Sequence, residues 1–89
     1  MRIERRDFLA LRPGRPAELS CERLYMRFLD AQADGTTSQL FAQLAADLRA
    51  TTAVHLTQTA WLSRVDLKSH LDRVLAAFTA AGGQVSQVP

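Results

Sequence analysis

The spacing of apolar and polar positions predicts an antiparallel hairpin in the first third of the chain. Residues 23–28 alternate with a period of two, which is typical of a strand with one buried and one exposed face. This strand could begin as early as Leu19. Residues 7–12 have the length of a short strand, and the turn at 13–16 ends it with two prolines and a glycine. We therefore expect two antiparallel strands joined by a longer loop.

Two later segments have helical spacing. Apolar residues recur every three or four positions from about residue 37 to 50, after a candidate capping box formed by Thr36 and Gln39. A second candidate box at 63–66 precedes a helix that runs to about Ala81, where two glycines stop it. Each helix has one apolar stripe, so we expect both helices on the same face of a sheet.

Two further strands complete the predicted order. Residues 53–58 follow the first helix, and residues 84–88 follow the second. The order ββαβαβ predicts an α/β fold, with α+β as the alternative, in which two helices pack on one face of a mixed four-stranded sheet. We expect a single domain over 1–89, with a basic strand or arm and turn over 1–16 and an α/β body over 17–89.

Composition changes this picture mainly at the N-terminus. The 89 residues are 47% hydrophobic and 22% charged, which is ordinary for a globular domain. Residues 1–15 hold five arginines against two carboxylates, while the rest of the chain is nearly neutral. Such an arm favours an acidic partner surface. No aromatic platform, zinc spacing or helix-turn-helix signature accompanies it, so we do not favour nucleic acid as the partner.

The stretch at 5–9, RRDFL, resembles the core of a twin-arginine export signal. Such a signal needs an apolar segment of about 7–15 residues after its basic start. Here Leu11 is followed at once by Arg12 and the turn. We therefore interpret the stretch as part of a strand with charged flanks. No apolar run reaches the roughly 20 residues of a membrane span, so we expect a cytoplasmic protein without a membrane segment.

In the tract from Leu56 to Val88, Trp61-Leu62-Ser63 leads into Asp66-Leu67 and then into a glycine-glycine turn before the last strand. This tract is the most specific part of a resemblance, running from about Leu24 to Val88, to the small α/β domain of the STAS family, best known from anti-sigma factor antagonists. The resemblance implies a protein-binding role. Antagonists of this family carry a phosphorylated serine at the strand-to-helix turn, where this chain reads Ser63-Arg64-Val65-Asp66. The resemblance therefore does not imply the phosphorylation switch. Phosphorylation of Ser63 would favour the interpretation as a degenerate STAS-type regulator.

The residues that could support catalysis or bind a metal are few. Cys21 is the single cysteine, and no histidine lies near it in the sequence, so we interpret it as a structural residue. His55 is expected on the outward face of its strand, and Asp66 can pair with His70 on a helix surface. No clustered ligand spacing is present. We predict no catalytic site, no metal site and no cofactor.

The interaction hypothesis has more residues in its favour. Arginine, tyrosine and tryptophan are favoured at protein interfaces, and the sheet face left open by the two helices could be covered by a partner. We predict a small non-enzymatic protein-interaction module that binds another protein or a second copy of itself. The alternatives are an accessory factor for protein maturation or export, and a degenerate STAS-type regulator. The predicted partner-binding residues are Arg5, Arg6, Arg12, Arg23, Tyr25, Arg27 and Trp61.

Overall fold

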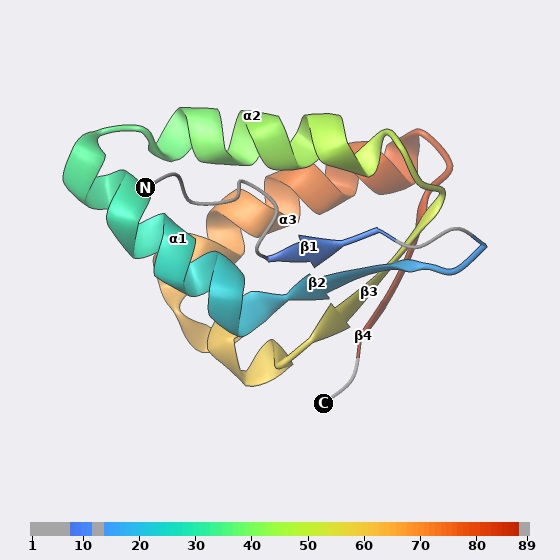
Figure 1. The fold of residues 1–89 in the computed structure, drawn as a ribbon, viewed down its shortest axis with the longest axis horizontal. Coiled ribbons are helices and arrows are strands. Elements are labelled where there is room, and N and C mark those ends of the chain that lie inside the picture. The colour runs from blue at the N-terminus through green and yellow to red at the C-terminus, as the bar shows by residue number, and fades with distance from the viewer. Residues whose placement is uncertain (1–7, 12–13, 88–89) are drawn as a thin grey trace.

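A computed structural model describes residues 8–11 and 14–87 of the chain (Figure 1). Its elements are, in order, β1 (Leu9–Ala10), β2 (Ala17–Ser20), α1 (Cys21–Asp34), α2 (Thr37–Leu48), β3 (Ala53–Thr57), the 3₁₀ helix η1 (Thr59–Ser63), α3 (Val65–Ala80) and β4 (Gln84–Gln87).

The four strands form one mixed sheet in the order β1-β2-β3-β4. β1 pairs with β2 antiparallel, with Leu9 opposite Leu19, so the first strand of the predicted hairpin is found within 7–12 but its partner lies at Ala17–Ser20 and not at 23–28. β2, β3 and β4 are parallel neighbours. The α/β class and the mixed four-stranded sheet are therefore as predicted. The number of helices is not, because the described residues contain three α-helices rather than two.

All three helices cover the same face of the sheet (Figure 1). On β2 and β3 the buried residues alternate with more exposed ones, as expected when one face meets a core. Helix and strand residues together form a single apolar cluster. Its fully buried members include Phe8, Leu9, Leu19, Leu24, Leu44, Leu48, Val54, Leu56, Leu67 and Leu71.

The predicted strand over 23–28 is wrong, because these residues belong to α1. Over six residues, an exposed apolar residue can make a helical pattern look like strand alternation. Met26 is that residue, with 54% of its surface exposed. The buried positions of α1 follow helical spacing instead, at Cys21, Leu24, Phe28 and Ala31. The strand that pairs with β1 lies just before, at Ala17–Ser20.

Local residues fix both ends of α1. Ser20 is the N-cap, and its hydroxyl accepts a hydrogen bond from the Arg23 backbone N–H at 3.2 Å. Gly35 ends the helix with a φ of 72°, a left-handed conformation that glycine adopts without the penalty of a Cβ atom.

The other elements lie close to the predicted ranges, but their caps differ. Thr36 is the N-cap of α2 as predicted, yet its side chain makes no capping hydrogen bond. The box predicted at Ser63 is absent, since Arg64 is the N-cap of α3 and the Ser63 hydroxyl donates to the Ala60 carbonyl at 3.0 Å. Trp61 lies in η1, between β3 and α3.

The open face of the sheet is polar and does not carry the residues predicted for it. Glu18, His55 and Ser86 are cross-strand neighbours there, on β2, β3 and β4. The outward position of His55 is as expected, and its Nδ1 lies 3.1 Å from the Ser86 hydroxyl. Arg23, Tyr25 and Arg27 lie on α1 and are therefore absent from this face.

The helical assignment of α1 makes a mutational prediction. Replacing Leu24 by alanine should lower the free energy of unfolding by about 2–5 kcal/mol, because the side chain is fully buried in the core. Replacing the exposed Met26 by alanine should change the free energy of unfolding by no more than about 0.5 kcal/mol. Urea denaturation of both variants measures the difference. Similar losses at both positions would indicate a strand with Leu24 and Met26 on one buried face.

Candidate functional site

The most distinctive surface feature is a stack of three side chains where α1 meets η1. The rings of Tyr25 and Trp61 lie 5.3 Å apart between centroids, with their planes inclined by 34°. The Arg64 guanidinium carbon lies 5.5 Å from the centroid of each ring. Arginine over an aromatic face is attracted by the ring quadrupole, which helps to hold all three side chains in place.

Hydrogen bonds between segments far apart in the sequence bring these residues together. Gln58, which follows β3, accepts a hydrogen bond from the Ser20 hydroxyl and donates to Glu22 Oε1 at 2.6 Å. The backbone of Gln58 has a φ of 57°, which lies in the left-handed region that residues other than glycine rarely adopt. This turn directs η1 back along α1, so that Trp61 reaches Tyr25.

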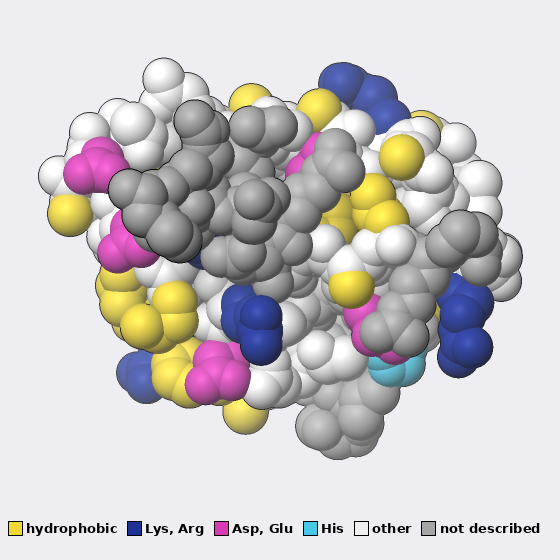
Figure 2. All heavy atoms as spheres, in the orientation of Figure 1, with side chains coloured by type: hydrophobic (Ala, Val, Ile, Leu, Met, Phe, Trp, Pro, Cys, Tyr) yellow, Lys and Arg dark blue, Asp and Glu magenta, His cyan; other side chains and the backbone are white. Residues whose placement is uncertain are grey.

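Exposed apolar side chains surround the stack. Leu29 and Val65 line one cavity of about 210 Å³ together with Tyr25 and Arg64. The side chains of Leu29, Met26 and Val65 are 40%, 54% and 79% exposed. Met26 and Leu29 are three residues apart on α1 and are therefore neighbours on its surface. We call the set Tyr25, Met26, Leu29, Trp61, Arg64 and Val65 the corner site. Figure 2 shows hydrophobic side chains gathered at the lower left, over α1 and the turn into α3.

The structure brings together only some of the predicted partner-binding residues. Tyr25 and Trp61 are in contact, as described. Arg27 instead lines a cavity between α1 and α2, and Arg23, four residues before it, shares that side of the helix. Arg5, Arg6 and Arg12 lie outside the described residues.

The sequence pattern predicts Tyr25 and Trp61 as partner-binding residues but not the other members of the corner site, Met26, Leu29, Arg64 and Val65. Arg64 and Val65 fall within the candidate capping box at 63–66, and nothing in the pattern indicates that this segment lies beside residues 21–34. Leu29 follows residues 23–28, whose alternation predicts a strand, so the pattern gives Leu29 no position on a helix surface. A helical assignment over 21–34 would have placed Leu29 beside Tyr25 and Met26.

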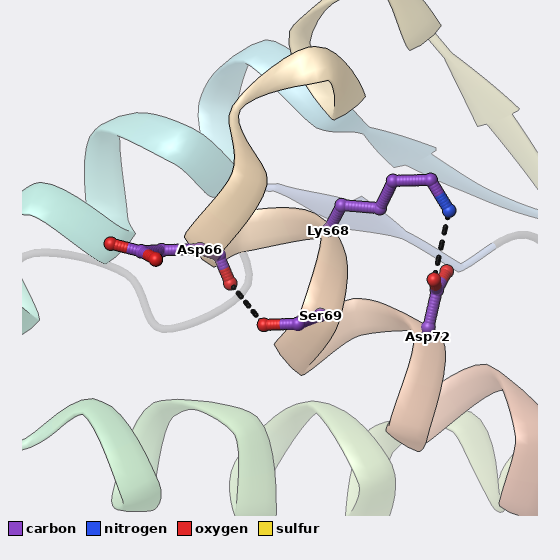
Figure 3. A network of polar contacts seen from close by, with 4 residues as sticks. All are labelled: Asp66, Lys68, Ser69 and Asp72. Atoms are coloured by element: carbon purple, nitrogen blue, oxygen red, sulfur yellow. Dashed lines mark hydrogen bonds and ion pairs between the residues drawn. The ribbon is translucent and has the colours of Figure 1, made fainter.

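The first turns of α3 also carry polar contacts within the helix (Figure 3). Lys68 Nζ lies 2.8 Å from Asp72 Oδ2, and the Ser69 hydroxyl donates to the Asp66 carbonyl at 3.1 Å. The expected pairing of Asp66 with His70 is not seen. The His70 ring stacks on Phe41 instead, with centroids 4.9 Å apart and planes inclined by 11°.

Cys21 is fully buried at the start of α1. Burial raises the pKa of its thiol to about 11, because the charged thiolate is poorly solvated in the core. The thiolate is the nucleophilic form, so Cys21 is unreactive near neutral pH. This agrees with the structural role predicted for it.

Among residues 8–11 and 14–87, no group of three or more histidine, cysteine, aspartate or glutamate residues is arranged to hold a metal ion. None of the helices in this part of the chain has the length and apolar content needed to cross a bilayer.

Comparison with known proteins adds no family to this description. No protein-family model, curated protein or solved structure matches the chain.

The raised pKa of Cys21 predicts how its reactivity depends on folding and pH. The native thiol should resist a disulfide reagent at pH 8, and denaturant should expose it to rapid labelling. Because the pKa is raised in the folded state, the thiol's contribution to stability is complete below pH ~9, the pKa of an unperturbed thiol, and is lost as the pH rises through about 11. Rapid labelling of the folded protein at pH 8 would contradict this account.

Proposed function

We propose that this chain is a small protein-binding module whose partner docks on the corner site. The observation that carries the proposal is the position of Leu29 and Val65, which are exposed apolar residues beside a preformed tyrosine–tryptophan–arginine stack. Tryptophan, tyrosine and arginine dominate the energetic centres of protein interfaces, and methionine is also enriched there.

The size of the cavity favours a partner side chain over a small molecule. Pockets for drug-sized ligands have volumes of about 300–1,000 Å³. The cavity between α1 and the start of α3 has a volume of about 210 Å³. It suits one apolar side chain that a partner inserts between Leu29 and Val65.

Arg64 supplies the polar part of the recognition. It is exposed and makes no ion pair with any described residue. Its contact with both rings restricts its motion, which lowers the entropy lost when it binds. A partner carboxylate beside the apolar anchor would form a charge-assisted hydrogen bond with it. Because Asp66 also lines the cavity, this carboxylate must lie closer to Arg64 than to Asp66. The expected partner segment therefore carries an apolar residue next to an acidic one.

The arginine-rich arm is a separate proposal. If residues 2–15 also contact the partner, they would strengthen binding through long-range attraction to its acidic surface. The roles in protein maturation or export and as a STAS-type regulator stay predictions from the sequence.

Affinity capture from the native lysate tests the proposal with three variants and the wild type. Leu29→Arg/Val65→Arg should lose the captured partner, with affinity falling tenfold or more, which corresponds to about 1.4 kcal/mol. Arg5→Ala/Arg6→Ala tests the arm independently. Arg73→Gln, an exposed substitution on α3 outside the corner site, is the control and should retain the partner.

Sedimentation and thermal unfolding complete this experiment. A wild-type dimer that dissociates in the Leu29→Arg/Val65→Arg variant would identify a second copy of the chain as the partner. Both replaced residues are exposed, so the variant should unfold near the wild-type temperature. Capture of identical proteins by wild type and this variant, with equal self-association, would refute the corner site.

A further inference from the structure

A second, larger cavity lies at the opposite end of α3. It has a volume of about 380 Å³ and opens between the C-terminal ends of α2 and α3. An adjoining cavity of about 500 Å³ reaches the turn before β2. The two share Arg49, Thr51 and Thr52 in their linings. These residues connect the end of α2 to β3.

The two cavities differ in chemistry. Apolar side chains, among them Leu48, Val74 and Phe78, line the first. Arg15 and Arg49 are the charged residues of the second, and none of the described residues that line either cavity is acidic. Neither guanidinium forms an ion pair with a described residue. An apolar chamber therefore opens beside two arginines.

The charged side chains that line the two cavities favour an anion. Two helices end there, and each helix C-terminus carries about half a negative charge. The last carbonyls of α2 and α3 already accept backbone hydrogen bonds from the residues that follow them, which reduces their availability to a ligand. Each guanidinium contributes a full positive charge, so the two arginines outweigh the two helix ends. Arginine also matches the planar, two-oxygen geometry of a carboxylate.

We propose that this pair of cavities binds a small amphipathic carboxylate, with its apolar body between α2 and α3 and its carboxylate at Arg49 and Arg15. A cavity of about 150 Å³ holds one benzene molecule. The apolar cavity is more than twice that size, at about 380 Å³, so it suits a medium-length alkyl chain or a body of one to two rings. This ligand is independent of the protein partner proposed for the corner site.

Gly83 gives a means of changing the apolar chamber without touching the charge. A Cβ atom at this position would lie 2.5–2.6 Å from three carbons of the Phe78 ring. Gly83 does not have a positive φ, so alanine fits the backbone and the ring must move instead. Since Phe78 lines the chamber, Gly83→Ala changes its shape.

The test is an NMR titration of the ¹⁵N-labelled full chain with octanoate, octan-1-ol and octylammonium. Octanoate should cause saturable shifts of the amides at 48–53 and 77–83, and the neutral and cationic probes should bind at least about fivefold more weakly. Arg49→Gln should lower the affinity for octanoate about five- to tenfold and leave the affinity for octan-1-ol unchanged. Arg73→Gln, outside both cavities, should leave all three affinities unchanged.

Gly83→Ala distinguishes the chamber from the charged mouth. It should change the affinity for octanoate and for octan-1-ol together, because both place the same alkyl chain against Phe78. The proposal would be overturned by equal affinity for the three probes, by octanoate shifts confined to residues away from the cavities, or by unchanged octanoate binding in Arg49→Gln. Absence of any saturable octanoate shift would also overturn it.

Discussion

Burial of a single face of the sheet determines where every helix lies. β2, β3 and β4 are parallel neighbours in chain order, so each connection must cross over the sheet, and right-handed crossovers in one direction all fall on the same side. α1, α2 and α3 therefore share one apolar layer with the strands. The uncovered face is left polar, with Glu18, His55 and Ser86 in a row across it. A chain of 89 residues buries only about 60–65% of its unfolded surface, so most of its stability rests on this one layer.

Crowding three helices onto one face also creates the two candidate sites. α3 has 16 residues and is about 24 Å long, and its two ends border different neighbours. Its first residues meet α1 and η1 at the corner site. Its last turns line the apolar cavity beside Arg49 together with the end of α2. The two sites differ in size and charge, which is why one suits a protein side chain and the other a small carboxylate.

The sequence predicted the elements whose pattern is long or bounded by strong turn signals. α2 and α3 each extend over three turns or more, and β3 is short but bounded by polar residues, so their ranges could be predicted closely. α1 could not, because the alternation over 23–28 mimics a strand when Met26 is counted as buried. Its true period appears only over the longer span from Cys21 to Ala31. Tyr25 and Trp61 could be predicted individually as interface residues. Their contact could not be predicted, because it depends on hydrogen bonds that join Gln58 to Glu22 and Ser20. These two residues precede Gln58 by 36 and 38 positions in the sequence.

The helical conformation of residues 21–34 is the central structural feature, because this helix covers the sheet and presents the corner site. Backbone ¹³Cα and ¹³Cβ chemical shifts of the full chain, with nuclear Overhauser contacts between aromatic rings, test it directly. The account predicts unbroken helical shifts from Cys21 to Asp34 and a contact between the rings of Tyr25 and Trp61. Strand-type shifts over residues 23–28, without that contact, would contradict it.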